Sequence, residues 1–135
     1  MSSLTEELIQ IREQRVAAVL ATVIEVAGNG RVESGDKCLI REGRVQTGTI
    51  RHDGLLRSIL QQAEACLKEE KSKLVPLEIP ESGGKVEVFF EVMPAPPTLI
   101  VVGAGHIAVP LVKFAKILDF RVAVLDDRML FANRE

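Results

Sequence analysis

The segment from Leu99 to Pro110, Leu-Ile-Val-Val-Gly-Ala-Gly-His-Ile-Ala-Val-Pro, decides how the last third of this chain folds. An apolar run ends in Gly103-Ala104-Gly105, and Ala108 follows three residues after the second glycine. This spacing is typical of the turn that joins a strand to a helix in nucleotide-binding domains. The first glycine permits the tight turn, the second lets a pyrophosphate approach the backbone, and the small third residue lets the helix pack closely on the sheet. We therefore expect a strand over Leu99–Val102 and a helix after it.

The residues downstream complete this pattern. The apolar residues that share one face of the expected helix are Ile107, Leu111, Phe114, Ala115 and Leu118. Pro110 lies just inside the first turn and is expected to cost one backbone hydrogen bond. A second strand is expected over Arg121–Leu125, and Asp126 follows it directly. A carboxylate there can accept hydrogen bonds from ribose hydroxyls and disfavours a 2′-phosphate, which favours NAD or another adenine nucleotide over NADP.

The order of strand, glycine turn, helix, strand and acid predicts a Rossmann-type βαβ unit whose helix start favours a bound anion. The residues expected to bind a cofactor are Gly103, Ala104, Gly105, His106, Ala108, Asp126 and Asp127. The alternative is that the glycines only close a tight corner of the backbone. His106 either contacts a phosphate, acts as an acid–base group or is a partly exposed helix residue. Asp127 and Arg128 either pair with each other or face a ligand.

The first 93 residues predict a mixed α+β domain. A helix over Leu4–Gln14 is indicated by the capping-box spacing of Ser3 and Glu6. A second helix is expected over Gly54–Lys71, where an apolar face repeats at helical spacing through Leu56, Ile59, Leu60, Ala63 and Leu67. β-Branched or alternating apolar residues predict strands over Val16–Ala27, Lys37–Arg41, Arg44–Thr49, Leu74–Ile79 and Lys85–Val92.

Three prolines within residues 94–97 resist helix and sheet and mark a stiff linker. The fold class is therefore α/β, with an N-terminal mixed α+β domain at 1–93, a proline linker at 94–97 and a partial Rossmann βαβ unit at 98–135. A first βαβ unit holds only the adenosine side of a dinucleotide, so we do not expect hydride transfer by this chain alone. Parallel strands need cover on both faces, which predicts a homodimer or larger assembly.

Composition limits the remaining function classes. The net charge is −2, with no Trp or Tyr, so neither nucleic acid nor an anionic membrane is an expected partner. The polar, acidic N-terminus does not resemble a signal peptide, no apolar stretch is long enough for a membrane span, and a cytoplasmic protein is expected. Cys38 and Cys66 match no metal spacing and are expected in the core, and no metal site is expected.

The sequence contains no catalytic arrangement that predicts an enzyme class, so the catalytic residues stay unknown and enzymatic activity stays open. The trio at residues 51–53, Arg51-His52-Asp53, either forms a small polar site or is a solvated loop in which Asp53 begins the next helix.

Three segments together resemble the xanthine dehydrogenase accessory factors, the XdhC/CoxI family. They are Leu99–Ala132, with its GAGHIA and LDDR motifs, Leu20–Ile50 and Ser82–Pro97. The resemblance implies a maturation factor for a molybdenum hydroxylase of the xanthine dehydrogenase type, which binds the molybdenum cofactor and delivers it to the apoenzyme. A non-catalytic accessory protein is therefore expected. Two alternatives stay open: an NAD- or adenine nucleotide-binding redox or sensor module, and a non-catalytic dimeric interaction protein.

Two positions depart from the pattern of that family. Its members typically carry a glycine-rich turn ending in Cys after the hairpin, whereas residues 48–54 contain no cysteine. They also have a Cys before two glycines where this chain has Ser82 before Gly83-Gly84. A thiolate can bind molybdenum or carry sulfur, and a serine hydroxyl does neither well. These departures argue against sulfur transfer by this chain.

Overall fold

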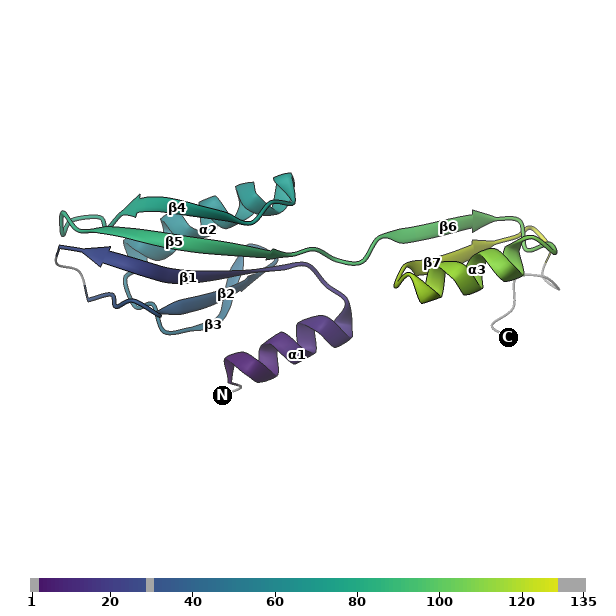
Figure 1. Ribbon diagram of the computed structural model, residues 1–135, viewed down its shortest axis with the longest axis horizontal. Coiled ribbons are helices and arrows are strands. Elements are labelled where there is room, and N and C mark those ends of the chain that lie inside the picture. Colours follow the sequence, from purple (N-terminus) through teal and green to yellow (C-terminus); the bar gives the residue numbers. More distant parts are fainter. Residues whose placement is uncertain (1–2, 29–30, 129–135) are drawn as a thin grey trace. The chain divides into compact units, whose positions relative to one another are not determined.

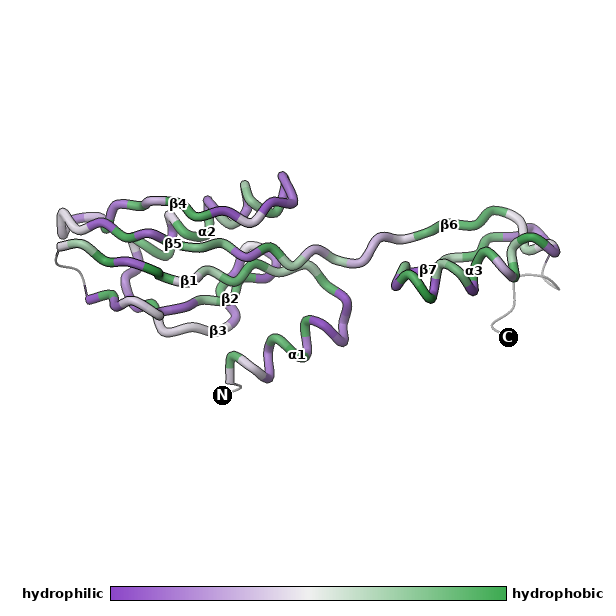
Figure 2. Tube along the Cα trace, in the orientation of Figure 1, coloured by the Kyte–Doolittle hydropathy of each residue, from purple (hydrophilic) through white to green (hydrophobic). Residues whose placement is uncertain are grey.

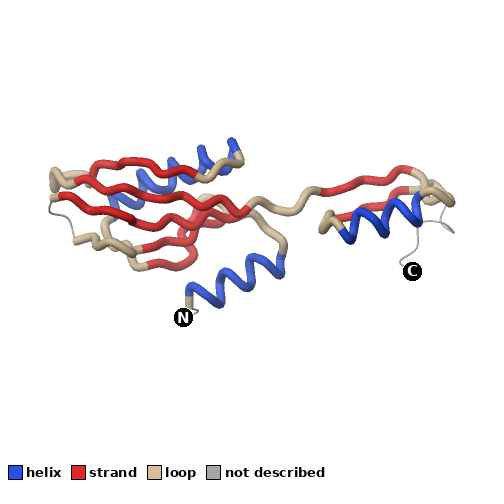
Figure 3. Tube along the Cα trace, in the orientation of Figure 1, coloured by secondary structure: helices blue, strands red, loops and turns tan. Residues whose placement is uncertain are grey.

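The structure is a computed structural model that describes residues 3–28 and 31–128. The chain divides into two compact units, Met1–Ala95 and Pro96–Glu135. The division falls within the proline-rich segment 94–97, which forms neither helix nor strand (Figure 3). Across the described residues, no helix combines the length and the apolar character that a membrane span requires.

The first unit begins with helix α1, Leu4–Gln14, which has the bounds that the sequence predicts. The Ser3 hydroxyl accepts a hydrogen bond from the Glu6 N–H at 3.2 Å, and the Glu6 carboxylate accepts one from the Ser3 N–H at 2.9 Å. The predicted capping box is therefore confirmed, and it satisfies backbone donors that the first turn leaves without helical partners. Ile11 packs α1 against Ala18 and Leu39 of the sheet.

Five antiparallel strands form the sheet of this unit, in the order β3-β2-β1-β5-β4 (Figure 1). Their bounds are β1 Ala18–Ala27, β2 Lys37–Arg41, β3 Arg44–Gly48, β4 Lys73–Glu78 and β5 Lys85–Met93. Every predicted strand is present, with ends that differ by at most two residues. The mixed α/β fold class is confirmed.

Helix α2, Asp53–Glu69, covers the opposite face of the sheet from α1 (Figure 1). The fully buried residues of α2 are Leu55, Ile59, Ala63 and Cys66, whereas Leu56, Leu60 and Leu67 are only partly buried. The buried face is thus centred one position away from the predicted one. Leu55 was missed because it lies in the first turn, where capping rather than periodicity dominates the sequence signal.

The second unit consists of β6 Thr98–Val102, α3 Ala108–Ile117 and β7 Arg121–Leu125. β6 and β7 are parallel, with Val101 opposite Val124, and β6 is hydrophobic along most of its length (Figure 2). Ala108 and Ala115 are the buried residues of α3. The small alanines allow the helix to approach the two strands closely. The larger members of the predicted apolar face are exposed in this chain: Ile107 81%, Phe114 65% and Leu118 69%.

Pro110 is the third residue of α3. The first four N–H groups of a helix have no intrahelical acceptor, so a proline here removes no helical hydrogen bond. The next amide, that of Leu111, donates to the Ile107 carbonyl at 3.4 Å. The expected loss of a backbone hydrogen bond is therefore wrong.

Candidate functional site

The glycine turn between β6 and α3 leaves open space beside its second glycine. Gly103 has a φ of +100°, which side-chain-bearing residues rarely adopt, and its N–H donates to the Leu125 carbonyl at 2.7 Å. A Cβ placed on Gly105 would have no described atom within 4 Å. No side chain caps the start of α3 among the described residues. The turn thus presents open backbone at a helix N-terminus, as an approaching anion requires.

Asp126 joins the end of β7 to this turn. One oxygen, Oδ2, accepts hydrogen bonds from the Ala104 N–H at 2.7 Å and from Arg128 Nη2 at 2.9 Å. The other, Oδ1, accepts from the Arg128 backbone N–H at 2.8 Å and from Arg128 Nε at 2.9 Å. An ionised carboxylate offers about four lone-pair positions, so the protein's own donors occupy all of them.

These hydrogen bonds also keep the carboxyl group of Asp126 ionised. The hydrogen bonds from the Arg128 side chain, and next the one from the Ala104 amide, hold the pKa of Asp126 far below its usual range. The side chain is 2% exposed beneath an Arg128 that is 56% exposed. Ribose recognition by Asp126 stays a prediction, and it requires the guanidinium of Arg128 to move away.

The remaining predicted cofactor-binding residues surround the same turn. His106 and Asp127 are exposed, and Ala108, the first residue of α3, is buried. Asp127 and Arg128 were expected either to pair with each other or to face a ligand. In the structure Arg128 pairs with Asp126 instead. The structure brings Ala104 of the glycine turn into contact with Asp126, and cofactor binding by the predicted residues stays a prediction.

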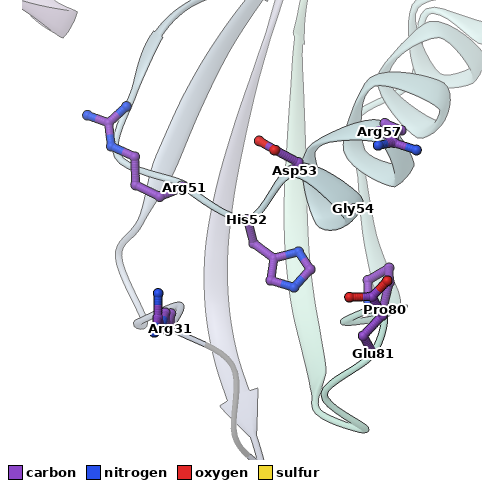
Figure 4. Close-up of a pocket in the computed structure, with 8 residues that line it drawn as sticks. All are labelled: Arg31, Arg51, His52, Asp53, Gly54, Arg57, Pro80 and Glu81. Carbon is purple, nitrogen blue, oxygen red and sulfur yellow. The ribbon is translucent and has the colours of Figure 1, made fainter.

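A second candidate site lies in the first unit, where three loops meet at the start of α2. A pocket of about 560 Å³ is lined there by Arg31, Arg51, His52, Asp53, Gly54, Arg57, Pro80 and Glu81. Figure 4 shows His52 between Arg31 and Arg51 on one side and Arg57 with the Pro80-Glu81 turn on the other. Three arginines and a histidine around one pocket make it a candidate site for an anionic ligand.

His52 is held by the helix that it caps. The Leu55 N–H donates to His52 Nδ1 at 3.1 Å, and the Leu56 N–H donates to the His52 carbonyl at 2.9 Å. Since Nδ1 is an acceptor, the neutral ring carries its proton on Nε2. Asp53 is the first residue of α2. Both alternatives for residues 51–53 therefore hold in part, because Asp53 begins the helix and the trio also lines a pocket.

Comparison with known proteins identifies the family. The sequence model of the XdhC and CoxI family matches residues 11–78, half of the chain. The chain belongs to the XdhC and CoxI family. It is 25% identical over 129 residues to the uncharacterized protein YqeB of Escherichia coli K12, an alignment that covers 89% of this chain and 24% of that protein.

The fold is also found in a solved structure. A crystal structure described as a xanthine dehydrogenase from Bacillus halodurans superposes with a TM-score of 0.54 at 16% identity, over 98% of this chain and 65% of that one. At this identity the likeness shows the fold alone. The chain spans about a quarter of the E. coli relative and less than two thirds of the crystallised protein.

The two segments in which this chain departs from the XdhC/CoxI pattern are in contact at Gly54 and Pro80. A Cβ on Gly54 would lie 3.0 Å from Cγ of Pro80, so the two segments touch. Ser82 holds its own turn, since its hydroxyl donates to the Ile79 carbonyl at 3.3 Å and accepts from the Gly84 N–H at 3.1 Å. The hydroxyl is therefore committed to the fold of the β4–β5 turn.

Neither cysteine of this family member can serve as an exposed thiolate in the folded unit. Cys38 and Cys66 are both completely buried, and burial raises the pKa of Cys38 to about 12. Within residues 3–28 and 31–128, no group of three His, Cys, Asp or Glu side chains is arranged to hold a metal ion. A molybdenum site with a cysteine ligand therefore does not fit the described residues.

Sequence reasoning missed Arg31, Arg57, Pro80 and Glu81 as pocket residues. They come from the loop after β1, the first turns of α2 and the β4–β5 turn, and no spacing in the sequence connects these segments. The sequence singled out Arg128 but did not predict its pairing with Asp126. Residue spacing places a carboxylate at the end of a strand, but it does not show which groups donate hydrogen bonds to that carboxylate.

Proposed function

We propose that this chain is an accessory protein for a molybdenum hydroxylase of the xanthine dehydrogenase type. Membership of the XdhC and CoxI family supports this role, and so does the likeness in fold to the Bacillus halodurans protein. The partner in this proposal is the hydroxylase before its maturation is complete. The described residues offer no thiolate ligand, so the proposed role is binding and presentation of a cofactor rather than sulfur transfer.

The finer part of the proposal is that the glycine turn binds the phosphates of a nucleotide-bearing cofactor. The observation that carries it is the open space beside Gly105 at the start of α3. Backbone N–H groups at a helix start attract a diphosphate, and a side chain at position 105 would obstruct its approach. The hydrogen bond from Ala104 to Asp126 holds the turn in place without filling that space.

Calorimetry against ADP, NAD and a molybdopterin nucleotide tests this binding. We expect at least one of them to bind, and we expect Gly105→Asp to weaken that binding at least tenfold, because the new carboxylate repels phosphate and fills the approach. Ile117→Asp is the matched control. It adds the same charge to an exposed residue at the other end of α3. Absence of binding at millimolar concentrations, or equal affinity of the Gly105 variant, would refute the phosphate role.

An Arg128→Ala variant tests the ribose role of Asp126 separately. It removes the two side-chain donors and leaves the bonds from Ala104 and from the residue 128 amide. If Asp126 recognises ribose, this variant should bind NAD more tightly than the parent chain. Unchanged or weaker NAD binding would assign Asp126 to holding the turn alone.

The accessory role has its own test in cells. Removal of the gene should lower the molybdenum content and activity of the partner hydroxylase while leaving the amount of its polypeptide unchanged. A fully active hydroxylase purified from such cells would contradict the proposal, whatever the chain binds in isolation.

A further inference from the structure

We propose that the pocket at the start of α2, in the first unit, binds a small phosphate ester. The site is separate from the glycine turn and does not depend on it. It is built from three stretches of chain: the loop after β1 with Arg31, the end of the β3–α2 connection and the start of α2 with Arg51 through Arg57, and the β4–β5 turn with Pro80 and Glu81. Figure 4 shows the residues of these three stretches that line the pocket.

The three guanidinium groups are available to a ligand. Arg31, Arg51 and Arg57 form no ion pair or hydrogen bond with another described residue, although Asp53 and Glu81 line the same pocket. Guanidinium groups offer planar pairs of donors that match the oxygens of a phosphate. Three unpaired arginines on one pocket therefore favour an anionic ligand over a neutral one, and their combined charge favours the dianion of a phosphate monoester over a single carboxylate.

The backbone of the pocket adds to this preference. The N-terminus of α2 opens into it, and the positive end of the helix dipole favours negative charge there. His52 keeps its Nδ1 on the Leu55 amide, which leaves the Nε2–H of the ring as a further donor. Gly54 permits the close approach of the helix start to Pro80, since a Cβ at residue 54 would lie 3.0 Å from the proline ring. A methyl group at this position would require the Pro80 ring to shift by a few tenths of an ångström.

The two carboxylates and the volume of the pocket define the rest of the ligand. Asp53 and Glu81 repel a bare anion, but they can accept hydrogen bonds from hydroxyl or amino groups. About 560 Å³ lies within the usual range for small-molecule sites. The chemistry is therefore that of a phosphate monoester whose organic part carries hydrogen-bond donors, and not that of inorganic phosphate alone.

The test uses ribose 5-phosphate, inorganic phosphate and ribose as probes, with the full chain, in a calorimeter at low salt. We expect ribose 5-phosphate to bind more tightly than inorganic phosphate, and ribose not to bind. Arg57→Ala should weaken the binding of ribose 5-phosphate about tenfold, and the triple variant of Arg31, Arg51 and Arg57 to Ala should abolish it. The matched control is Arg44→Ala, an exposed arginine of β3 outside the pocket, which should bind within twofold of the parent chain.

Each outcome decides a part of the proposal. Equal binding by the triple variant, or no binding of ribose 5-phosphate at millimolar concentrations, would overturn it. Equal affinity for inorganic phosphate would overturn the role given to Asp53 and Glu81. Far-UV circular dichroism verifies that the variants are folded. A Gly105→Asp chain should bind ribose 5-phosphate normally, so that failure of the glycine-turn proposal and failure of this one can be told apart.

Discussion

The two cysteines should be nearly inert toward alkylation while the first unit is folded. Burial raises the pKa of Cys38 from 9.0 to about 12. Near pH 8 this lowers the thiolate fraction roughly a thousandfold. A more basic thiolate is intrinsically more nucleophilic, by roughly 20-fold for this difference, so ionisation alone leaves about a 50-fold loss of rate. Complete burial of both side chains then slows the reaction further, because the reagent must wait for the unit to open.

Iodoacetamide labelling followed by mass spectrometry measures this loss. The reference is the same chain in urea, where both thiols react as free cysteines, and Cys38→Ala and Cys66→Ala variants assign each signal. The alkylation rate of Cys38 in the folded chain should keep rising tenfold per pH unit above pH 9.0, whereas the alkylation rate of a free thiol levels off there. Labelling of either thiol in the folded chain at the rate found in urea would refute the reasoning. It would also restore sulfur transfer as a possible function.

The remaining predictions concern stability, measured by urea unfolding with far-UV circular dichroism because the chain has no Trp or Tyr. Phe90→Ala should lower the free energy of unfolding by about 3–5 kcal/mol, since Phe90 is completely buried in β5. Phe89→Ala, on the other face of β5 and 38% exposed, should cost under about 1.5 kcal/mol, and equal losses would contradict the assigned faces. Gly48→Ala should cost about 1–3 kcal/mol, because the new Cβ would lie 2.8 Å from Cα of Cys38; an unchanged midpoint would mean that β3 moves freely. Ser3→Ala should cost about 1 kcal/mol through loss of the cap, and no change would show that α1 adds nothing to the stability of the unit.

Local sequence signals predicted the elements of both units well. The capping box fixed the start of α1, and the alternation of Val86, Val88 and Phe90 correctly assigned the buried face of β5. Such patterns work because a helix turn or a pleated strand repeats over a few residues, so the information lies within a short stretch of chain.

The candidate sites could be predicted only where they also rest on short-range order. The glycine turn has a fixed spacing and was found. The pocket was not, because the sheet order β3-β2-β1-β5-β4 brings the loop after β1 beside the β4–β5 turn about 50 residues later. The sequence also could not show that the hydrogen-bond acceptors of Asp126 are all occupied, because this depends on where the Arg128 guanidinium lies. Spacing gives the position of a carboxylate, but not the number of its lone pairs already in use.

The pocket also bears on how this chain differs from the family pattern. The connection that lacks the family's cysteine and the turn that carries Ser82 in place of one meet at the start of α2. Thiolates at such a place would suit soft metals and sulfur, whereas arginines suit hard oxyanions. If ribose 5-phosphate binds there as proposed, this chain holds an oxyanion at the place where the family pattern has cysteines. The proposed accessory role would then consist of holding a phosphorylated compound, because Cys38 and Cys66 are buried in the core.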